Sequence, residues 1–158
     1  LLSHLCHGCL GWAVNAIDDF VLNQRAEYLD ELTKLVEADG EGRFAYASRL
    51  AVLFARDSVT VQQRLSLWLD WWRDLLLIKV GLNDSITNAD RLAGLVVLAD
   101  QYSLYQIKKY IEGIRAASCQ LRQNANPQLV LEVLVLAIPD VLISTGGTLS
   151  ARIEVKNA

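Results

Sequence analysis

Val59-Thr-Val-Gln-Gln-Arg-Leu-Ser-Leu-Trp68-Leu-Asp-Trp-Trp72-Arg-Asp-Leu-Leu-Leu-Ile-Lys-Val80 is the stretch that decides the fold. Its apolar residues recur at about 100° per residue, which predicts a helix with two apolar strips on nearly opposite sides. One strip consists of Val61, Leu65, Trp68, Leu69, Trp72 and Leu76, the other of Leu67, Trp71, Leu75 and Ile78. Ser66, Asp70, Arg73 and Asp74 form only a narrow polar sector. Such a helix either runs through the middle of a bundle or keeps one strip for another chain.

The two segments before this helix each carry a single apolar stripe, as helices that cover a core do. The stripes are Leu22, Leu29, Leu32 and Val36 in a helix from 20 to 36, then Phe44, Ala47, Leu50, Ala51 and Phe54 in a second helix. Asp39-Gly40-Glu41-Gly42 breaks the pattern between them. Asp57-Ser58 ends the second helix and offers an N-cap to the third.

Three further helices are predicted downstream of a loop at residues 81–88. The first, capped by Asn88, carries Leu92, Leu95, Val96 and Ala99; the second, capped by Ser103, carries Leu104, Ile107, Ile111, Ile114, Ser118 and Leu121. Asn126-Pro127 is a strong start signal for the third. That helix, 129–138, is apolar on every side, so we expect it to be buried all round, in its own domain or against partners. Pro139 stops it.

These capped segments predict an all-α bundle of five to seven helices over residues 19–139. The remaining residues, 140–158, alternate apolar and polar side chains around Gly146-Gly147, which indicates a possible short β-hairpin. An isolated hairpin is marginally stable in water, so this tail needs a helix or another chain to pack against.

The composition fits a compact helical domain. Of 158 residues, 53% are hydrophobic and 21% charged, which excludes disorder by composition. The net charge of −3 gives no basic footprint for nucleic acid. No apolar run approaches the roughly 20 residues that span a bilayer, and no secretory signal is present, so we expect a cytoplasmic location and no membrane contact. A start at Leu1-Leu2 without any Met suggests a piece of a longer protein.

The residues that could carry chemistry are few. His4, Cys6, His7 and Cys9 are four potential zinc ligands, but they crowd into six residues, so we expect no bound metal. No glycine pair is followed by the Lys-Ser/Thr of a phosphate-binding loop. Cys119 is expected to be a small buried hydrophobe. We expect no catalytic residues and no cofactor.

One predicted helix has a basic character. Lys108, Lys109, Arg115 and Arg122 recur along it, with Tyr105 and Tyr110 among them. Such a face can hold single-stranded nucleic acid, but in an acidic chain a solvated face or a contact with an acidic partner is favoured.

The order of motifs resembles a known family. Trp72-Arg-Asp-Leu-Leu-Leu-Ile-Lys79-Val-Gly81, then Ser103-Leu104, then Asn124-Ala-Asn-Pro127-Gln-Leu-Val-Leu-Glu132 resembles the C-terminal collar domain of the delta-prime subunit of the bacterial DNA polymerase III clamp loader. Gly8-Cys-Leu-Gly11-Trp-Ala13 is similar to the turn that ends the lid domain of the AAA+ clamp-loader ATPases. Gly11 stands where the ATP-hydrolysing members have a nucleotide-sensing arginine, which fits the delta-prime type.

This resemblance implies a lid-domain remnant at 1–18, a collar domain at 19–139 and a separate tail at 140–158. It also implies a non-catalytic assembly (oligomerisation) module that joins other clamp-loader subunits in a hetero-oligomer, which loads sliding clamps in DNA replication. Direct contact with nucleic acid is not expected from this domain. The candidate partner-contact residues are Leu67, Trp71, Leu75 and Ile78, with Arg115 and Arg122 supplying peripheral charge. Alternatively, Trp71 belongs to the core and the Trp68/Trp72 side faces outward.

A second hypothesis is an all-α ligand-binding or dimerisation domain of a bacterial regulator. Four tryptophans and a largely apolar interior could line a small-molecule pocket between helices. An upstream helix-turn-helix would favour this hypothesis, whereas an upstream nucleotide-binding domain would favour the collar.

Overall fold

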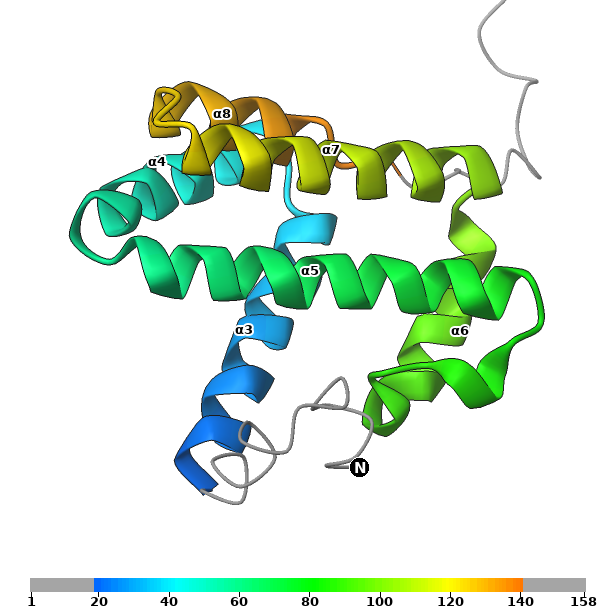
Figure 1. Cartoon of the computed structure of the whole chain (residues 1–158). Helices are drawn as coiled ribbons and strands as arrows, with labels where there is room; N and C mark the ends of the chain where they lie inside the picture. Colours follow the sequence, from blue (N-terminus) through cyan, green and yellow to red (C-terminus); the bar gives the residue numbers. More distant parts are fainter. Residues whose placement is uncertain (1–18, 141–158) are drawn as a thin grey trace, which may run out of the picture.

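The computed structural model describes residues 19–140, and these form an all-α bundle (Figure 1). The helices are α3 (Asp19–Glu37), α4 (Gly40–Arg56), α5 (Ser58–Lys79), α6 (Leu92–Gln101), α7 (Leu104–Arg122) and α8 (Pro127–Leu136), with the 3₁₀ helices η1 (Asn83–Ser85) and η2 (Ala89–Arg91) between α5 and α6. The described range contains no strand, and the prediction of five to seven helices is confirmed. The expected lid remnant, the cluster of His4, Cys6, His7 and Cys9, and the expected hairpin lie outside the described residues.

Most helix boundaries follow the predicted local signals. The Asp57 carboxylate accepts the backbone N–H of Thr60 at 3.0 Å and caps α5, as predicted. The Asp39 carboxylate accepts the backbone N–H of Gly42 at 2.8 Å and caps α4, a role that was not predicted. Ser103 forms a capping box with Gln106 at the start of α7. Asn126 accepts the Leu129 N–H at 3.3 Å, directly before Pro127 at the first position of α8.

The break between α3 and α4 is shorter than predicted. Only Ala38 and Asp39 lie outside the two helices, and Gly40 to Gly42 form the first turn of α4. A side chain at Gly42 would place its Cβ 3.2 Å from the Asp39 carboxylate that caps the helix. Glycine therefore marks close packing at the cap here and not the end of a helix.

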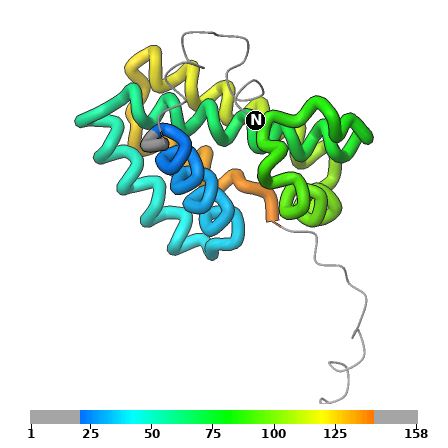
Figure 2. Tube along the Cα trace, turned by 90° about the horizontal axis from the view of Figure 1, so that it is seen from below, coloured from blue at the N-terminus to red at the C-terminus, as the bar shows by residue number. Residues whose placement is uncertain are grey.

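Helix α5 runs through the middle of the bundle. α3 and α4 lie against one part of it, α6 packs near its C-terminal end, and α7 extends along it (Figures 1 and 2). Ser118 of α7 donates to Gln62 near the start of α5 at 2.6 Å, and Lys79 at its end donates to the Ala99 carbonyl of α6 at 2.8 Å. The central-helix alternative is therefore the correct one for α5.

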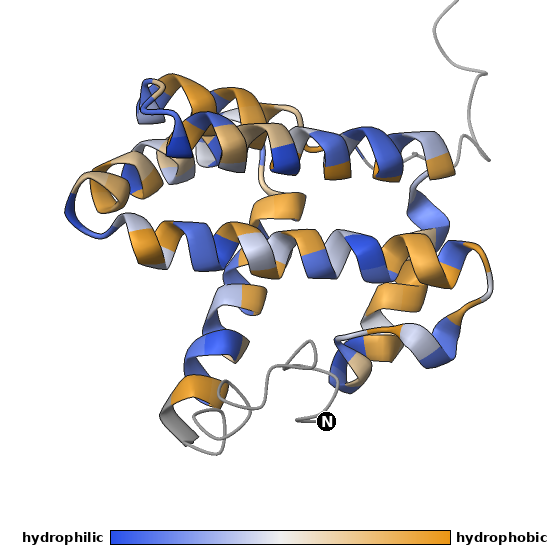
Figure 3. Ribbon diagram, viewed as in Figure 1, coloured by the Kyte–Doolittle hydropathy of each residue, from blue (hydrophilic) through white to orange (hydrophobic). Residues whose placement is uncertain are grey.

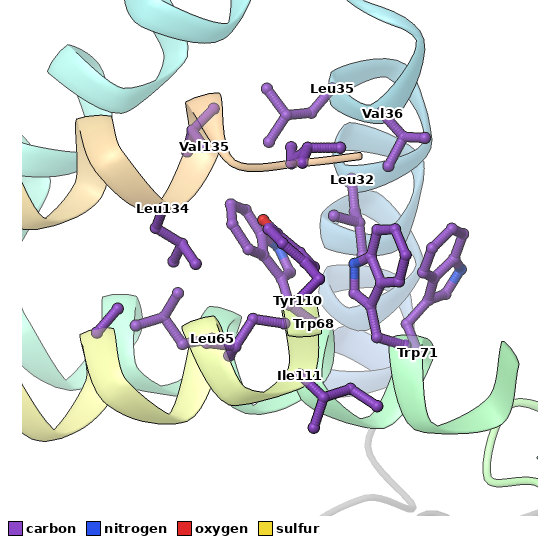
Figure 4. Packing of buried hydrophobic residues seen from close by; sticks show 14 of the residues in the cluster. Leu32, Leu35, Val36, Leu65, Trp68, Trp71, Tyr110, Ile111, Leu134 and Val135 are labelled. Atoms are coloured by element: carbon purple, nitrogen blue, oxygen red, sulfur yellow. The ribbon is translucent and has the colours of Figure 1, made fainter. Parts of the chain in front are cut away.

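Aromatic side chains of α5 fill the centre of the core. The Trp72 ring lies 4.6 Å from Tyr110, 5.3 Å from Tyr102 and 5.4 Å from Trp71, measured between ring centroids. Figure 4 shows side chains of α3, α5, α7 and α8 gathered into one cluster. Burial raises the pKa of Tyr110 far above its ordinary value, so this phenol stays neutral inside the core.

The buried Arg43 joins the ends of two helices. Its guanidinium donates to the Val36 carbonyl at 3.0 Å and to the Ile138 carbonyl at 2.9 Å. These carbonyls lie at the end of α3 and just after α8, where backbone acceptors lack partners inside a helix. One side chain thus fixes where α3, α4 and the end of α8 meet.

Two expectations about burial are wrong. Asp74, assigned to the polar sector of α5, is fully buried, whereas Cys119, expected to be buried, is exposed. Helix α8, expected to be buried in its own domain or against partners, is largely apolar (Figure 3) and is covered by its own domain on one face only, so cover by a partner stays a prediction. Within residues 19–140, neither α8 nor any other helix combines the length and apolarity needed to cross a membrane.

Asp74 is the centre of a buried polar network. Its carboxylate accepts the backbone N–H of Thr87 at 2.8 Å and both the backbone N–H and the side-chain amide of Asn88 at 2.7 Å. The Asn88 side-chain oxygen in turn accepts from Arg25 of α3, which also pairs with Asp90 at 3.2 Å. The expected N-cap role of Asn88 is wrong: its side chain makes no cap hydrogen bond and instead connects α5 with α3.

Replacing Asp74 by Ala should lower the free energy of unfolding by about 3 kcal/mol, because buried donors of Thr87 and Asn88 would lose their acceptor. Urea unfolding monitored by circular dichroism measures this loss. Asp100→Ala, at an exposed acid on α6, is the control and should change stability by less than about 0.5 kcal/mol. Equal stability of the two variants would contradict the structural role of Asp74.

Candidate subunit interface

The predicted contact residues on α5 separate into core and partly exposed positions. Trp71 and Leu75 have 2% and 0% of their surfaces exposed. Leu67 and Ile78 are half-buried, and Ile78 packs against the core. Trp71 and Leu75 are therefore inaccessible to a partner in this structure, which corrects their expected role and supports the core alternative for Trp71.

The opposite strip of α5 does not face outward either. Trp68 and Trp72 are both buried, since other helices of the same chain cover both strips. These tryptophans fill the core and do not line a ligand pocket of the kind that the regulator hypothesis requires. Most of the two-stripe pattern is thus explained by the fold itself.

Arg115 and Arg122 lie on the outer face of α7. Both are exposed, and with Lys108 they recur every seven residues, which places the three cations on one side of the helix. Tyr105 is exposed on the same helix, whereas Tyr110 packs against Trp72 and is unavailable for stacking with a ligand. The contact role of Leu67, Ile78, Arg115 and Arg122 stays a prediction.

One exposed apolar surface, on α8, was not among the predicted contact residues. Leu129, Val133 and Leu136 on α8 have 59%, 60% and 50% of their surfaces exposed. Their spacing of four and three residues puts them on one face, and we call these three residues the α8 stripe. The sequence did indicate such a surface, because a helix that is apolar on every side must pack against other elements or another chain on every side.

Helix α4 holds α8 in place. The two pack against each other over much of their length, and Val130, Leu131, Leu134 and Val135 form the covered face of α8. At the edge of the contact, Gln128 donates to Ser48 of α4 at 3.2 Å. Because these contacts use one face of α8, the α8 stripe is left open to solvent.

No group of three or more His, Cys, Asp or Glu side chains is arranged to hold a metal ion between residues 19 and 140. The features that stand out on the described surface are apolar and cationic. Such features are typical of contact surfaces.

The sequence comparisons connect this fold to a family. The family model described as DNA polymerase III, delta subunit, C terminal, matches residues 21–139. The chain belongs to this family. The searches of curated proteins and of solved structures gave no significant match. Membership makes this domain part of a clamp-loader subunit. The family description names the delta subunit, so the delta-prime assignment stays a prediction.

Replacing Trp71 by Ala should lower the free energy of unfolding by about 3–5 kcal/mol, because it opens a cavity beside Trp72. Leu67→Ala, at a half-buried position on the same helix, is the control and should cost about 1 kcal/mol. Urea unfolding followed by circular dichroism measures both. A Trp71→Ala variant that keeps wild-type stability but loses its partners would restore the interface role of this residue.

Proposed function

We propose that this chain contains the collar domain of the delta-prime subunit of a bacterial DNA polymerase III clamp loader. Its function is to join this subunit to the other clamp-loader subunits in the assembly that places the sliding clamp on DNA. Family membership over residues 21–139 supports the clamp-loader assignment. The motif order from Trp72 to Glu132 supports the delta-prime type.

The observation that carries the assembly role is the α8 stripe. Three large apolar side chains side by side on one helix face expose hydrocarbon to water, and contiguous apolar surface of this kind marks contact sites. Complete burial of such a side chain contributes about 1.5–3 kcal/mol, and each of these is already partly covered. We propose that a neighbouring clamp-loader subunit covers the α8 stripe.

Peripheral charge fits the same role. Arg115 and Arg122 on α7 are exposed, and arginine is favoured at protein interfaces, where its guanidinium can pair with carboxylates. We infer a contact function for these residues, with Leu67 and Ile78 as secondary candidates. The proposal includes no catalytic step, a cytoplasmic location and no direct contact with DNA.

Val133→Glu in the complete subunit should weaken association with the other clamp-loader subunits at least about tenfold, since it would bury a carboxylate in an apolar contact. The unfolding temperature should stay close to that of the wild type, because Val133 is exposed. Val97→Glu on α6 is a matched control: its valine is 61% exposed and its charge change is identical. Co-purification from a reconstituted mixture of subunits measures the association.

The two variants and the reconstitution give separate answers. Equal association of Val133→Glu and Val97→Glu would contradict the α8 interface. In mixtures that lack one subunit at a time, the wild-type protein should restore clamp loading only where delta-prime is missing. Restoration where delta is missing would keep the clamp-loader function and contradict the delta-prime assignment.

A further inference from the structure

A groove opens where α3, α4 and α5 meet, away from the polar network of Asp74. Its volume is about 410 Å³, within the range of roughly 300–1,000 Å³ typical of ligand sites. The buried side chains of Leu35, Tyr46 and Leu50 form an apolar floor, and Leu53 is half-buried in the wall. A groove with such a floor can accept an apolar side chain.

The charged residues that line the groove are predominantly basic. Lys34, Arg49 and Arg64 oppose a single carboxylate, Glu31, so the lining has a formal charge of +2 in a chain of net charge −3. Lys34 and Arg49 are exposed and form no ion pair with any carboxylate in the described part of the chain. The Arg49 guanidinium lies 5.6 Å from the centre of the Tyr46 ring, a contact that leaves its charge in place. Because no carboxylate neutralises Lys34 or Arg49, their positive charge can attract an anion.

The other two charged residues of the groove, Arg64 and Glu31, already form an ion pair with each other. Glu31 accepts from Arg64 at 2.6 Å and from the Tyr46 hydroxyl at 3.2 Å. The Arg64 guanidinium also lies 4.0 Å from the centre of the Tyr28 ring, which fixes it from a second side. Burial raises the pKa of Tyr46 to about 12, so the hydroxyl remains a neutral donor to Glu31. Glu31 is thus committed to Arg64 and Tyr46 and leaves Lys34 and Arg49 uncompensated.

We propose that this groove binds an acidic peptide segment of a partner protein, one that presents a carboxylate next to an apolar side chain. The apolar side chain would pack on Leu35, Leu50 and Leu53, and the carboxylate would pair with Lys34 and Arg49 at the rim. This site is separate from the α8 stripe and does not depend on the clamp-loader assignment.

The chemistry of the groove favours a peptide over a nucleic acid. A phosphate backbone is held by a series of cations along its path, whereas here two free cations flank an apolar floor. The aromatic side chain in the lining, Tyr46, is buried and its ring already faces the Arg49 guanidinium, so it offers little surface for a base to stack on. The net negative charge of the chain also disfavours a polyanion. A peptide with one carboxylate beside one apolar side chain matches the positive charge of Lys34 and Arg49 and the apolar floor of the groove.

The test uses the ¹⁵N-labelled 158-residue chain and the peptide acetyl-Gly-Glu-Leu-Glu-Gly-amide, followed by NMR. Saturable shifts should appear in the amide signals of Lys34, Gly42 and Leu50, with a dissociation constant in the millimolar range or below. A peptide with glutamine in place of both glutamates should bind at least about tenfold more weakly. Added salt should weaken the binding of the acidic peptide, because the two cations are exposed.

Charge-reversal variants locate the site. Lys34→Glu and Arg49→Glu should each weaken binding about tenfold or more and leave the rest of the spectrum that of a folded protein. Arg56→Glu is the matched control, because this exposed arginine lies on α4 outside the groove, and its binding should match that of the wild type. Equal effects of Arg49→Glu and Arg56→Glu would show a general charge effect and overturn the proposal.

Two further results would also overturn it. One is the absence of saturable shifts with the acidic peptide, or equal binding of its glutamine form. The other is binding of a thymidine oligonucleotide in the groove without binding of the peptide, which would make the site a nucleic-acid contact.

Discussion

The burial of α5 on both sides is the constraint on which the rest of this structure depends. A helix with apolar side chains on opposite faces cannot lie at the surface of a bundle, so other elements must cover each face. Here α3, α4, α6 and α7 do so, and Trp72 contacts Tyr102, Tyr110 and Trp71 at the centre. The two-stripe pattern of α5 therefore indicates a helix in the middle of its own domain. The tryptophans of α5 are core residues.

Polar side chains then fix how the covering elements sit on α5. Asp74 binds the loop before α6, and Arg25 connects this loop to α3 through Asn88. A buried carboxylate is costly unless donors surround it, and here three N–H groups do so. Hydrogen bonds depend on distance and angle, whereas apolar packing does not depend on direction. The bonds of Asp74 therefore fix the conformation of the loop that contains Thr87 and Asn88.

Features that depend on neighbouring residues, such as helix caps, could be predicted from the sequence. Features that depend on how the helices pack, such as the burial of single side chains, could not. The caps at Asp57, Ser103 and Asn126 were predictable because each involves residues three positions apart. The burial of Asp74 and the exposure of Cys119 and Val133 depend on how each helix is rotated about its axis, which only tertiary contacts set. For the same reason the groove could not be predicted, since α3, α4 and α5 contribute separate parts of it.

We propose that α5 belongs to a core that is complete within the domain, and that a neighbouring subunit covers the α8 stripe. Amide hydrogen exchange of the complete subunit, alone and in the reconstituted clamp loader, tests it most directly. The amides from Trp68 to Leu75 should be among the slowest to exchange in both states, and those of α8 should slow markedly on assembly. Fast exchange along α5 in the free subunit that slows only on assembly would contradict the account, because α5 would then owe its burial to the partner.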